Sequence, residues 1–331
     1  MKLEVDLYIV STPYHILMAC NRCKSEDILI LFGKDKLSKF LENMLLHFFY
    51  DHWIQAMSLD DYKKNKIEFL IFKRNMHILQ KQIKGFSKQI RNIIVFNDVD
   101  PETQWLLNRI THVGEIILIE EGIGLYRKIH KKNDILFRIF GKLFFGWEFV
   151  NVEQIGELKK IDKIICRFPD KLTEVQKRKK IELQEEKCFD RVRENMNINY
   201  LEGQNWFIGQ PVVEDGVMSI ERFMKIIFRL SNMKKSLIVK PHPRENLEKY
   251  SRIENIEIIH DNTIPIELLL DNCQDYRFYT LYSSAIIQAA NYGKAGALYK
   301  LAQIDLPFEI ESVFEQSDVK IMNTWSEVEK L

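Results

Sequence analysis

The sequence has few cysteines and no long apolar run, and each scarcity excludes a class of protein. Only 5 of the 331 residues are cysteine, an odd number at irregular spacing that does not form a disulfide framework. No apolar run approaches the roughly 20 residues of a membrane-spanning helix. No leader is recognisable either, because the apolar run Val5–Val10 is short and contains Asp6. We therefore expect a protein of the reducing cytoplasm.

The chain also lacks an excess of charge and a dinucleotide-binding glycine motif. It has 48 Lys and Arg against 47 Asp and Glu, so few cations remain to offset the phosphates of a nucleic acid. Its 13 glycines form no G-x-G-x-x-G sequence, which excludes the usual NAD or FAD site. We expect no nucleic-acid partner and no redox cofactor.

What the chain does contain is an alternation of short apolar runs and amphipathic segments, typical of α/β proteins. A length of 331 residues is too long for one ordinary core and suits two domains. We predict a Rossmann-like domain over residues 1–200 and a second over 201–331. The polar stretch 171–200 is expected to be a solvated helix and the connection between the domains. Within the first domain, Ile67–Phe72 is predicted to be a strand.

A histidine between two prolines follows the apolar run Ser236–Val239. Proline fixes φ and supplies no N–H, so the chain must leave the predicted strand and hold a rigid loop. Ligands of open α/β sheets bind beyond the carboxyl ends of strands. His242, flanked by Lys240 and Arg244, is therefore predicted to meet a phosphate and give it a proton.

Other second-domain residues complete a donor site. Ser283 and Ser284 lie between a predicted strand and a helix N-terminus, where hydroxyls and free N–H groups bind anions. Glu267 can accept hydrogen bonds from both hydroxyls of a ribose. We also place Gly209 and Gln210, in the turn after the domain's first strand, at this site.

The first domain offers acceptor-side candidates and a pair of acids. Thr12, Tyr14 and His15 follow the first strand, where Thr12 can cap a helix that starts at Pro13. The adjacent carboxylates of Glu120 and Glu121 end another strand, and such a pair makes a candidate base.

Two further motifs favour structural roles. Asp98-Val99-Asp100 has the D-x-D form of a metal site, but Asp100 followed by Pro101 is more typical of a helix N-terminus. Cys20 and Cys23 are expected to be buried thiols. We therefore predict no bound metal.

A basic, Phe-rich segment covers residues 127–145. It can lie on an anionic membrane surface, here the inner face of the plasma membrane. It can equally be a helix with a Phe core face and a lysine outer face.

The motifs together resemble those of bacterial sialyltransferases, with most likeness to the lipooligosaccharide and capsular enzymes of glycosyltransferase family 52. The matching stretches are Glu120–Gly124, Phe140–Trp147, Gly209-Gln210-Pro211, Lys240–Arg244 and Tyr279–Ala285, together with Thr12-Pro13-Tyr14. The resemblance implies a GT-B fold, with two Rossmann-like domains facing across a cleft. It also implies inverting, metal-independent transfer of sialic acid from CMP-sialic acid to a terminal galactose of a bacterial surface glycan. We favour an α2,3 linkage, with α2,6 left open.

The resemblance further implies roles for individual residues. His242 is the general acid on the departing phosphate, Ser283 and Ser284 bind that phosphate, and Glu267 binds the ribose. The family's base is an aspartate soon after the motif matched by Gly209-Gln210-Pro211.

This sequence departs from the family pattern at the base, because Val212 follows the motif and the nearest acids are Glu214 and Asp215. The base is therefore either Asp215 or one of the first-domain pair, Glu121 or Glu120. The oligomeric state also stays open, with a homodimer as one option.

Two other functions compete with sialyl transfer. Teichoic-acid polymerases transfer a polyol phosphate from CDP-glycerol and would need a second histidine as base, for which His15 is best placed. A catalytically inactive glycan- or nucleotide-binding protein is the second alternative. The retained acid pair, His242 and the two serines argue against it.

Overall fold

The structure is a computed structural model of the 331-residue chain. It describes residues 3–33, 37–58, 66–86, 88–128, 139, 141–143, 145–184, 189–198, 203–270 and 275–331, with only the backbone of 66–70. The chain divides into two compact units, Met1–Glu185 and Glu186–Leu331.

Unit 1 contains a seven-stranded sheet in the order β3-β2-β1-β4-β5-β6-β7, in which every described pair is parallel. The strands are β1 (Glu4–Val10), β2 (Ile28–Phe32), β3 (Trp53–Ala56), β4 (Gln89–Val95), β5 (Ile116–Ile119), β6 (Lys163–Cys166) and β7 (Lys180–Leu183). The helices are α1 (Pro13–Arg22), α2 (Lys39–Phe49), α3 (Lys66–Gly85), α4 (Pro101–Leu107), η2 (Ile123–Tyr126), η3 (Pro169–Lys171) and α6 (Glu174–Lys177).

Unit 2 repeats this plan with six strands in the order β10-β9-β8-β11-β12-β13, also parallel throughout. The strands are β8 (Asn205–Ile208), β9 (Leu237–Lys240), β10 (Ile256–Ile258), β11 (Tyr276–Thr280), β12 (Gly293–Ala297) and β13 (Val319–Ile321). The helices are α7 (Asp190–Met196), α8 (Ile220–Met233), η4 (Leu247–Tyr250), η5 (Ile266–Leu268), α9 (Ala285–Ala289), α10 (Phe308–Gln316) and α11 (Trp325–Lys330).

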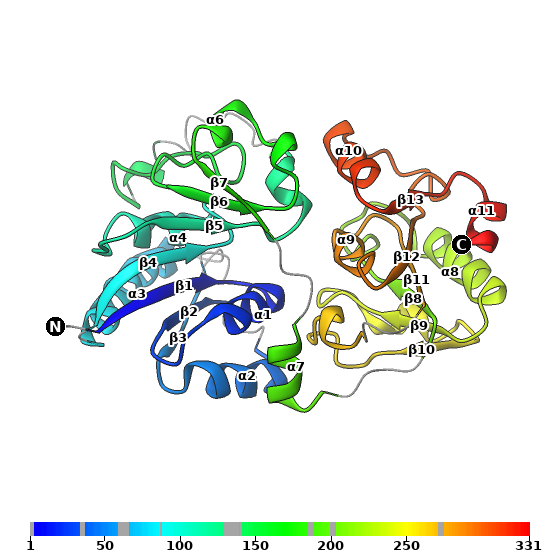
Figure 1. Ribbon diagram of the computed structural model, residues 1–331, viewed down its shortest axis with the longest axis horizontal. Coiled ribbons are helices and arrows are strands. Elements are labelled where there is room, and N and C mark those ends of the chain that lie inside the picture. The colour runs from blue at the N-terminus through cyan, green and yellow to red at the C-terminus, as the bar shows by residue number, and fades with distance from the viewer. Residues whose placement is uncertain are drawn as a thin grey trace. The chain divides into compact units, whose positions relative to one another are not determined.

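Both sheets therefore have the Rossmann strand order, counted from the first strand of each unit. Figure 1 shows each unit as one twisted sheet accompanied by helices. In each unit the order reverses beside the first strand, between β1 and β4 and between β8 and β11. The predicted pair of Rossmann-like α/β units is confirmed, and these two reversal points are where such sheets bind ligands.

Helix α8 illustrates how the core forms. Its apolar residues recur at helical spacing, so that Phe223, Ile227 and Leu230 are fully buried on one face. They pack in a cluster that includes Phe207 of β8 and Tyr279 of β11. Ser219 caps the helix by accepting the Arg222 N–H. This packing fixes β8 and β9, and with them the starting points of the loops that follow these strands.

The predicted strand Ile67–Phe72 is wrong, because this run belongs to α3. Phe72, Met76, Leu79 and Ile83 are buried at helical spacing along α3, so one apolar stripe continues through the helix. The third strand of the sheet is instead Trp53–Ala56, a half-buried edge strand.

The prediction of one solvated helix over 171–200 is also wrong, because the described part of this stretch holds two short helices, α6 and α7, with a strand between them. Residues 180–183 form β7, an edge strand whose side chains are largely exposed, so no apolar run was needed to make it. Helix α7 falls in unit 2, where Arg193 donates to the carbonyls of Glu267 and Leu268 at 2.9 and 3.2 Å. The charged run 185–188 lies outside the described residues.

Cys20 and Cys23 are buried thiols, as predicted. Among the described residues, no helix combines the length and the apolar character that crossing a bilayer needs.

Candidate functional site

Three neighbouring strands of unit 2 bring the predicted donor-side loops together. Strands β9, β8 and β11 are adjacent, and they lead into His242, Gln210 and Ser283. Parallel strands end at the same edge of a sheet, so the three loops share that edge. Gln210 ties two of them, because its Oε1 accepts the Tyr282 N–H at 2.7 Å.

The two serines stand at the start of α9 with their side chains half-buried. The Ser283 N–H donates to Thr280 Oγ1 at 3.2 Å, and Ser283 Oγ accepts the Ala285 N–H at 3.4 Å. Ser284 occupies the N-cap position but makes no side-chain capping bond. Since Ser283 Oγ acts as an acceptor, its hydroxyl hydrogen can be given to a ligand.

Glu267 lies in η5, which packs against α9. The residue is buried, and its backbone is anchored by Arg193. Glu267, the residue predicted to bind the ribose, therefore lies on a helix that packs against the helix that the two serines begin.

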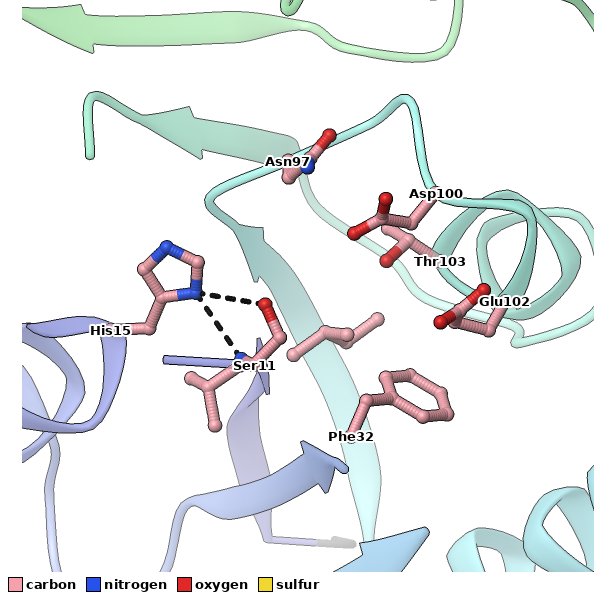
Figure 2. Close-up of a pocket in the computed structure, with 9 residues that line it drawn as sticks. Ser11, His15, Phe32, Asn97, Asp100, Glu102 and Thr103 are labelled. Atoms are coloured by element: carbon pink, nitrogen blue, oxygen red, sulfur yellow. Dashed lines mark hydrogen bonds between the residues drawn. The ribbon is translucent and has the colours of Figure 1, made fainter. Parts of the chain in front are cut away.

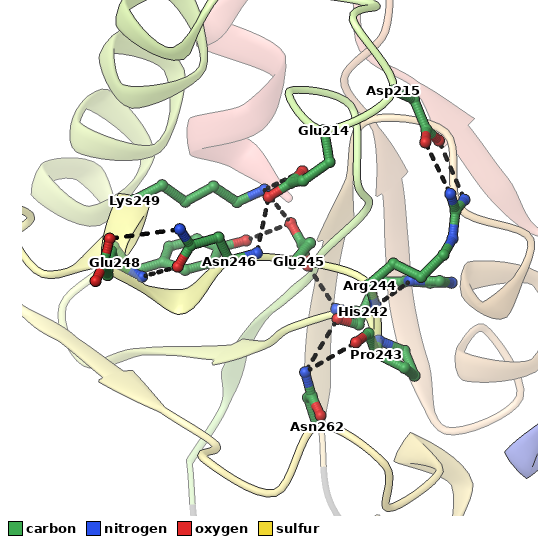
Figure 3. A network of polar contacts seen from close by, with 11 residues as sticks. Glu214, Asp215, His242, Pro243, Arg244, Glu245, Asn246, Glu248, Lys249 and Asn262 are labelled. Carbon is green, nitrogen blue, oxygen red and sulfur yellow. Dashed lines mark hydrogen bonds and ion pairs between the residues drawn. The ribbon is translucent and has the colours of Figure 1, made fainter. Parts of the chain in front are cut away.

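His242 is held by its own loop in a single orientation (Figure 3). Its N–H donates to Glu245 Oε2, and its Nδ1 accepts the Arg244 N–H at 3.1 Å. Asn262 Nδ2 donates to the His242 carbonyl at 3.3 Å. Because Nδ1 is an acceptor, the neutral ring carries its hydrogen on Nε2.

Glu245 anchors the loop that carries His242. Its carboxylate is buried, accepts the Tyr250 hydroxyl at 2.9 Å and pairs with Lys249 Nζ at 2.7 Å. A Cβ at Gly209 would collide with Glu245 Oε2, so the glycine of the neighbouring turn leaves the space for this carboxylate. Lys249 also pairs with Glu214 at 3.0 Å, which fixes the acids after that turn.

The two cations beside His242 already have protein partners. Lys240 Nζ is buried and donates to the carbonyls of Pro241 and Asn262 at 3.1 and 2.8 Å, and burial lowers its pKa to about 8. Arg244 forms a bidentate pair with Asp215, with N–O distances of 2.7 and 3.1 Å. Lys240 therefore anchors the loop, while Arg244 stays at the surface.

Burial, together with the positive charges of Arg244 and Lys240, lowers the pKa of His242 to about 4. At neutral pH the free protein holds this ring as a neutral Nε2–H donor. The negative charge of a bound anion would favour the charged ring and raise the pKa again.

In unit 1 the two acids have different environments. Glu121 is 27% exposed, and its Oε2 contacts His15 Nε2. Glu120 is fully buried and accepts the Arg167 Nε–H and N–H at 2.7 and 2.6 Å, together with the Tyr126 hydroxyl. Three donors therefore engage the carboxylate of Glu120, whereas Glu121 is partly exposed and contacts His15 through one oxygen.

The remaining first-unit residues cluster at the carboxyl end of β1. Thr12 caps α1 by accepting the His15 N–H at 3.2 Å, and Tyr14 is half-buried in the first turn.

The predicted helix N-terminus at Asp100-Pro101 is confirmed, since α4 begins at Pro101. Asp98 accepts the Gly156 and Leu158 N–H groups at 2.8 and 2.9 Å. Within the described ranges, no group of three or more acids, histidines or cysteines is arranged to hold a metal ion.

Several residues that shape the site carried no signal in the sequence. Arg167 and Tyr126 neutralise and bind Glu120, yet Arg167 is 47 positions away from it. Glu245 was visible only as a neighbour of the proline-bracketed histidine. A buried acid that serves the backbone cannot be recognised from spacing alone.

Two solved structures share the fold of the chain. S. aureus MnaA with UDP matches with a TM-score of 0.59 at 13% identity, covering 98% of this chain and 85% of that chain. The calicheamicin glycosyltransferase CalG4 matches with a TM-score of 0.52 at 9% identity, covering 97% and 86%. The fold is that of the GT-B glycosyltransferases, as the motif resemblance implied.

The sequence also matches a protein family over most of its length. Residues 6–299 match the alpha-2,8-polysialyltransferase (POLYST) family, and the chain belongs to this family. Membership supports glycosyl transfer as the activity and confirms the predicted relation to sialyltransferases at that level. A comparison with curated proteins found no match.

Proposed function

We propose that the protein transfers sialic acid from CMP-sialic acid to a glycan, with inversion and without a metal ion. The observation that carries this proposal is His242, fixed as a neutral Nε2–H donor on the strand edge that it shares with the Ser283-Ser284 loop. A phosphate at this edge would meet ring and hydroxyl donors together.

The donor side stabilises the leaving group. As the bond between the anomeric carbon and the phosphate oxygen breaks, the electron pair stays with CMP, which departs as a phosphate monoester. His242 Nε2–H and the hydroxyls of Ser283 and Ser284 are the donors for the charge that develops. The neutral ring can only donate a hydrogen bond, and it becomes a general acid once the bound donor phosphate has raised its pKa and the ring carries a second proton. That proton then passes from Nε2 to the phosphate oxygen as the bond breaks, and general acid help of this kind contributes roughly 10²–10⁴-fold to the rate.

The acceptor hydroxyl attacks the anomeric carbon and gives its proton to a carboxylate. Glu121 suits this role best, because Glu120 already accepts three hydrogen bonds and Asp215 is paired with Arg244. The anomeric carbon is tertiary and bears a carboxylate, so the transition state is strongly oxocarbenium-like and the proton moves late.

The motif resemblance and the matched family indicate different acceptors. The motif resemblance favours a terminal galactose and an α2,3 linkage. The description of the family favours an α2,8 linkage onto a terminal sialic acid, and we adopt it as the first choice. Lactose and sialyllactose offered side by side distinguish the two acceptors.

The competing polyol-phosphate transfer requires His15 as a second base. His15 is 2% exposed, its Nδ1 accepts the Ser11 N–H at 3.2 Å, and its Nε2 contacts Glu121. With both nitrogens engaged, the ring has no site for a substrate proton. This arrangement favours sialyl transfer over the alternative.

Incubation with CMP-sialic acid, lactose or sialyllactose, and EDTA tests the proposal. We expect CMP release coupled to sialylation of at least one acceptor. CMP release without transfer would leave the donor assignment standing and refute both acceptors. No CMP release would refute sialyl transfer, and consumption of CDP-glycerol in a parallel incubation would then support the polyol-phosphate alternative.

We also propose peripheral contact with an anionic membrane surface near residues 139–150. Leu143 and Trp147 are 64% and 85% exposed, while Phe145 and Phe149 face the core. The other phenylalanines of the segment, Phe137, Phe140 and Phe144, lie outside the described residues. Exposed Trp and apolar side chains beside Lys142 are typical of interfacial segments. Vesicles with phosphatidylserine should co-sediment the protein, and Trp147→Ser should weaken binding severalfold. Equal binding to neutral vesicles would contradict the electrostatic part.

A further inference from the structure

His15 is buried in the first turn of α1 with both ring nitrogens engaged. Its ring stacks on Phe96 at a centroid distance of 4.5 Å and an interplanar angle of 10°. Nδ1 accepts the Ser11 N–H at 3.2 Å, with Ser11 Oγ at 3.4 Å, and Nε2 contacts Glu121 Oε2. Figure 2 shows Ser11 and His15 with the contact between them.

These partners determine the tautomer of the ring. A backbone N–H can only donate, so Nδ1 is unprotonated and the neutral ring carries its hydrogen on Nε2. His15 is therefore the donor in its contact with Glu121, 106 positions along the chain. The Phe96 stack and the Ser11 bond leave the ring little freedom to turn away.

We infer that His15 is the positioning residue for the catalytic base, an inference that rests on the proposed function. It holds one oxygen of Glu121 and leaves the other, Oε1, to take the proton of the acceptor hydroxyl. In the part of the chain that the structure describes, Oε1 accepts no hydrogen bond. The pair joins the loops after β1 and β5, and Phe96 follows β4 between them.

The surroundings of His15 exclude direct contact between its ring and the acceptor. The side chain is 2% exposed. The cavity on its Nδ1 side, which is also lined by Asn97, Asp100 and Thr103, measures about 10 Å³. That volume suits a single water molecule and excludes a sugar ring. His15 therefore acts through Glu121 and does not bind the acceptor.

Two substitutions test the role by kinetics. His15→Phe keeps an aromatic ring on Phe96 but removes the donor, and we expect kcat to fall about 10²-fold with little change in the donor KM. His15→Gln restores an N–H near the Nε2 position and should recover at least a fifth of the lost activity. His47→Phe, on the exposed face of α2, is the matched control and should leave kcat unchanged.

A double-mutant cycle distinguishes positioning of the base from a structural effect. In a Glu121→Gln background, His15→Phe should lower the remaining turnover by less than about twofold. A full-size additional loss in that background would overturn the inference. So would wild-type kcat in His15→Phe itself.

A spectroscopic measurement makes the test independent of turnover. In protein labelled with ¹⁵N-histidine, His15 should show the Nε2–H tautomer, and loss of one signal in His15→Gln or His15→Phe identifies it. An Nδ1–H tautomer would overturn the inference even if His15→Phe fails to fold. If the wild-type protein transfers no sialic acid, the proposed function fails and the catalytic role with it. An active wild type with normal His15→Phe turnover refutes His15 alone.

Discussion

Replacing Glu121 with glutamine is expected to lower kcat for sialyl transfer by at least about 10²-fold, because an amide cannot take the proton of the acceptor hydroxyl. The change keeps the size of the side chain and an oxygen that can still accept from His15, so the fold should persist. Steady-state rates of CMP release at saturating acceptor measure the effect, and the melting temperature checks the fold.

Asp215→Asn is the decisive comparison for the identity of the base. Asp215 is exposed and paired with Arg244, so its neutralisation should alter the donor KM more than kcat. If Asp215→Asn abolishes transfer while Glu121→Gln leaves it near normal, the base is Asp215 and the assignment to unit 1 is refuted.

Truncating His242 to alanine is expected to reduce kcat by at least about 10²-fold with folding intact. The ring is only partly buried and contributes no core packing, while the loop keeps Glu245 and Asn262 as anchors through the backbone. His260→Ala, an exposed histidine of the same unit, serves as the control and should retain wild-type turnover. Near-normal activity of His242→Ala would show that another group assists the leaving phosphate.

The protonation of His242 supplies a test that needs no turnover. Its pKa in the free protein is lowered from about 6.5 to about 4, so its NMR signals should titrate near pH 4. Bound CMP should raise this pKa, because the phosphate favours the charged ring. The unfolded chain binds the proton first, so stability declines as the pH falls from about 6.5 toward 4. A free-protein titration near 6.5 would contradict the described burial.

The sequence predicted the strand ends and helix start that carry the proposed donor-side residues, because that information is local. The apolar run before Lys240, the two prolines and the serines before α9 each fix a strand end or a helix start within a few residues. The two edge strands of unit 1 escaped prediction for the same reason. Trp53–Ala56 and Lys180–Leu183 pair on one side only and bury little, so neither has the apolar run by which a strand is recognised.

Charge pairing shows where local information ends. From spacing alone, Lys240 and Arg244 looked equally suited to a phosphate, and Glu120 and Glu121 to a base. In the folded protein, Lys240 binds two carbonyls, Arg244 pairs with Asp215, and Arg167 binds Glu120. Each of these partners is fixed by proximity across strands, which no short-range pattern encodes.

By itself, the sequence determined two Rossmann-like units and a rigid histidine loop at a strand end, because periodicity and proline geometry act over a few residues. Only the tertiary structure decided which carboxylate stays open to solvent and that His15 holds it. Hydrogen bonds and ion pairs depend on distances between groups far apart in the chain, and folding alone brings those groups together.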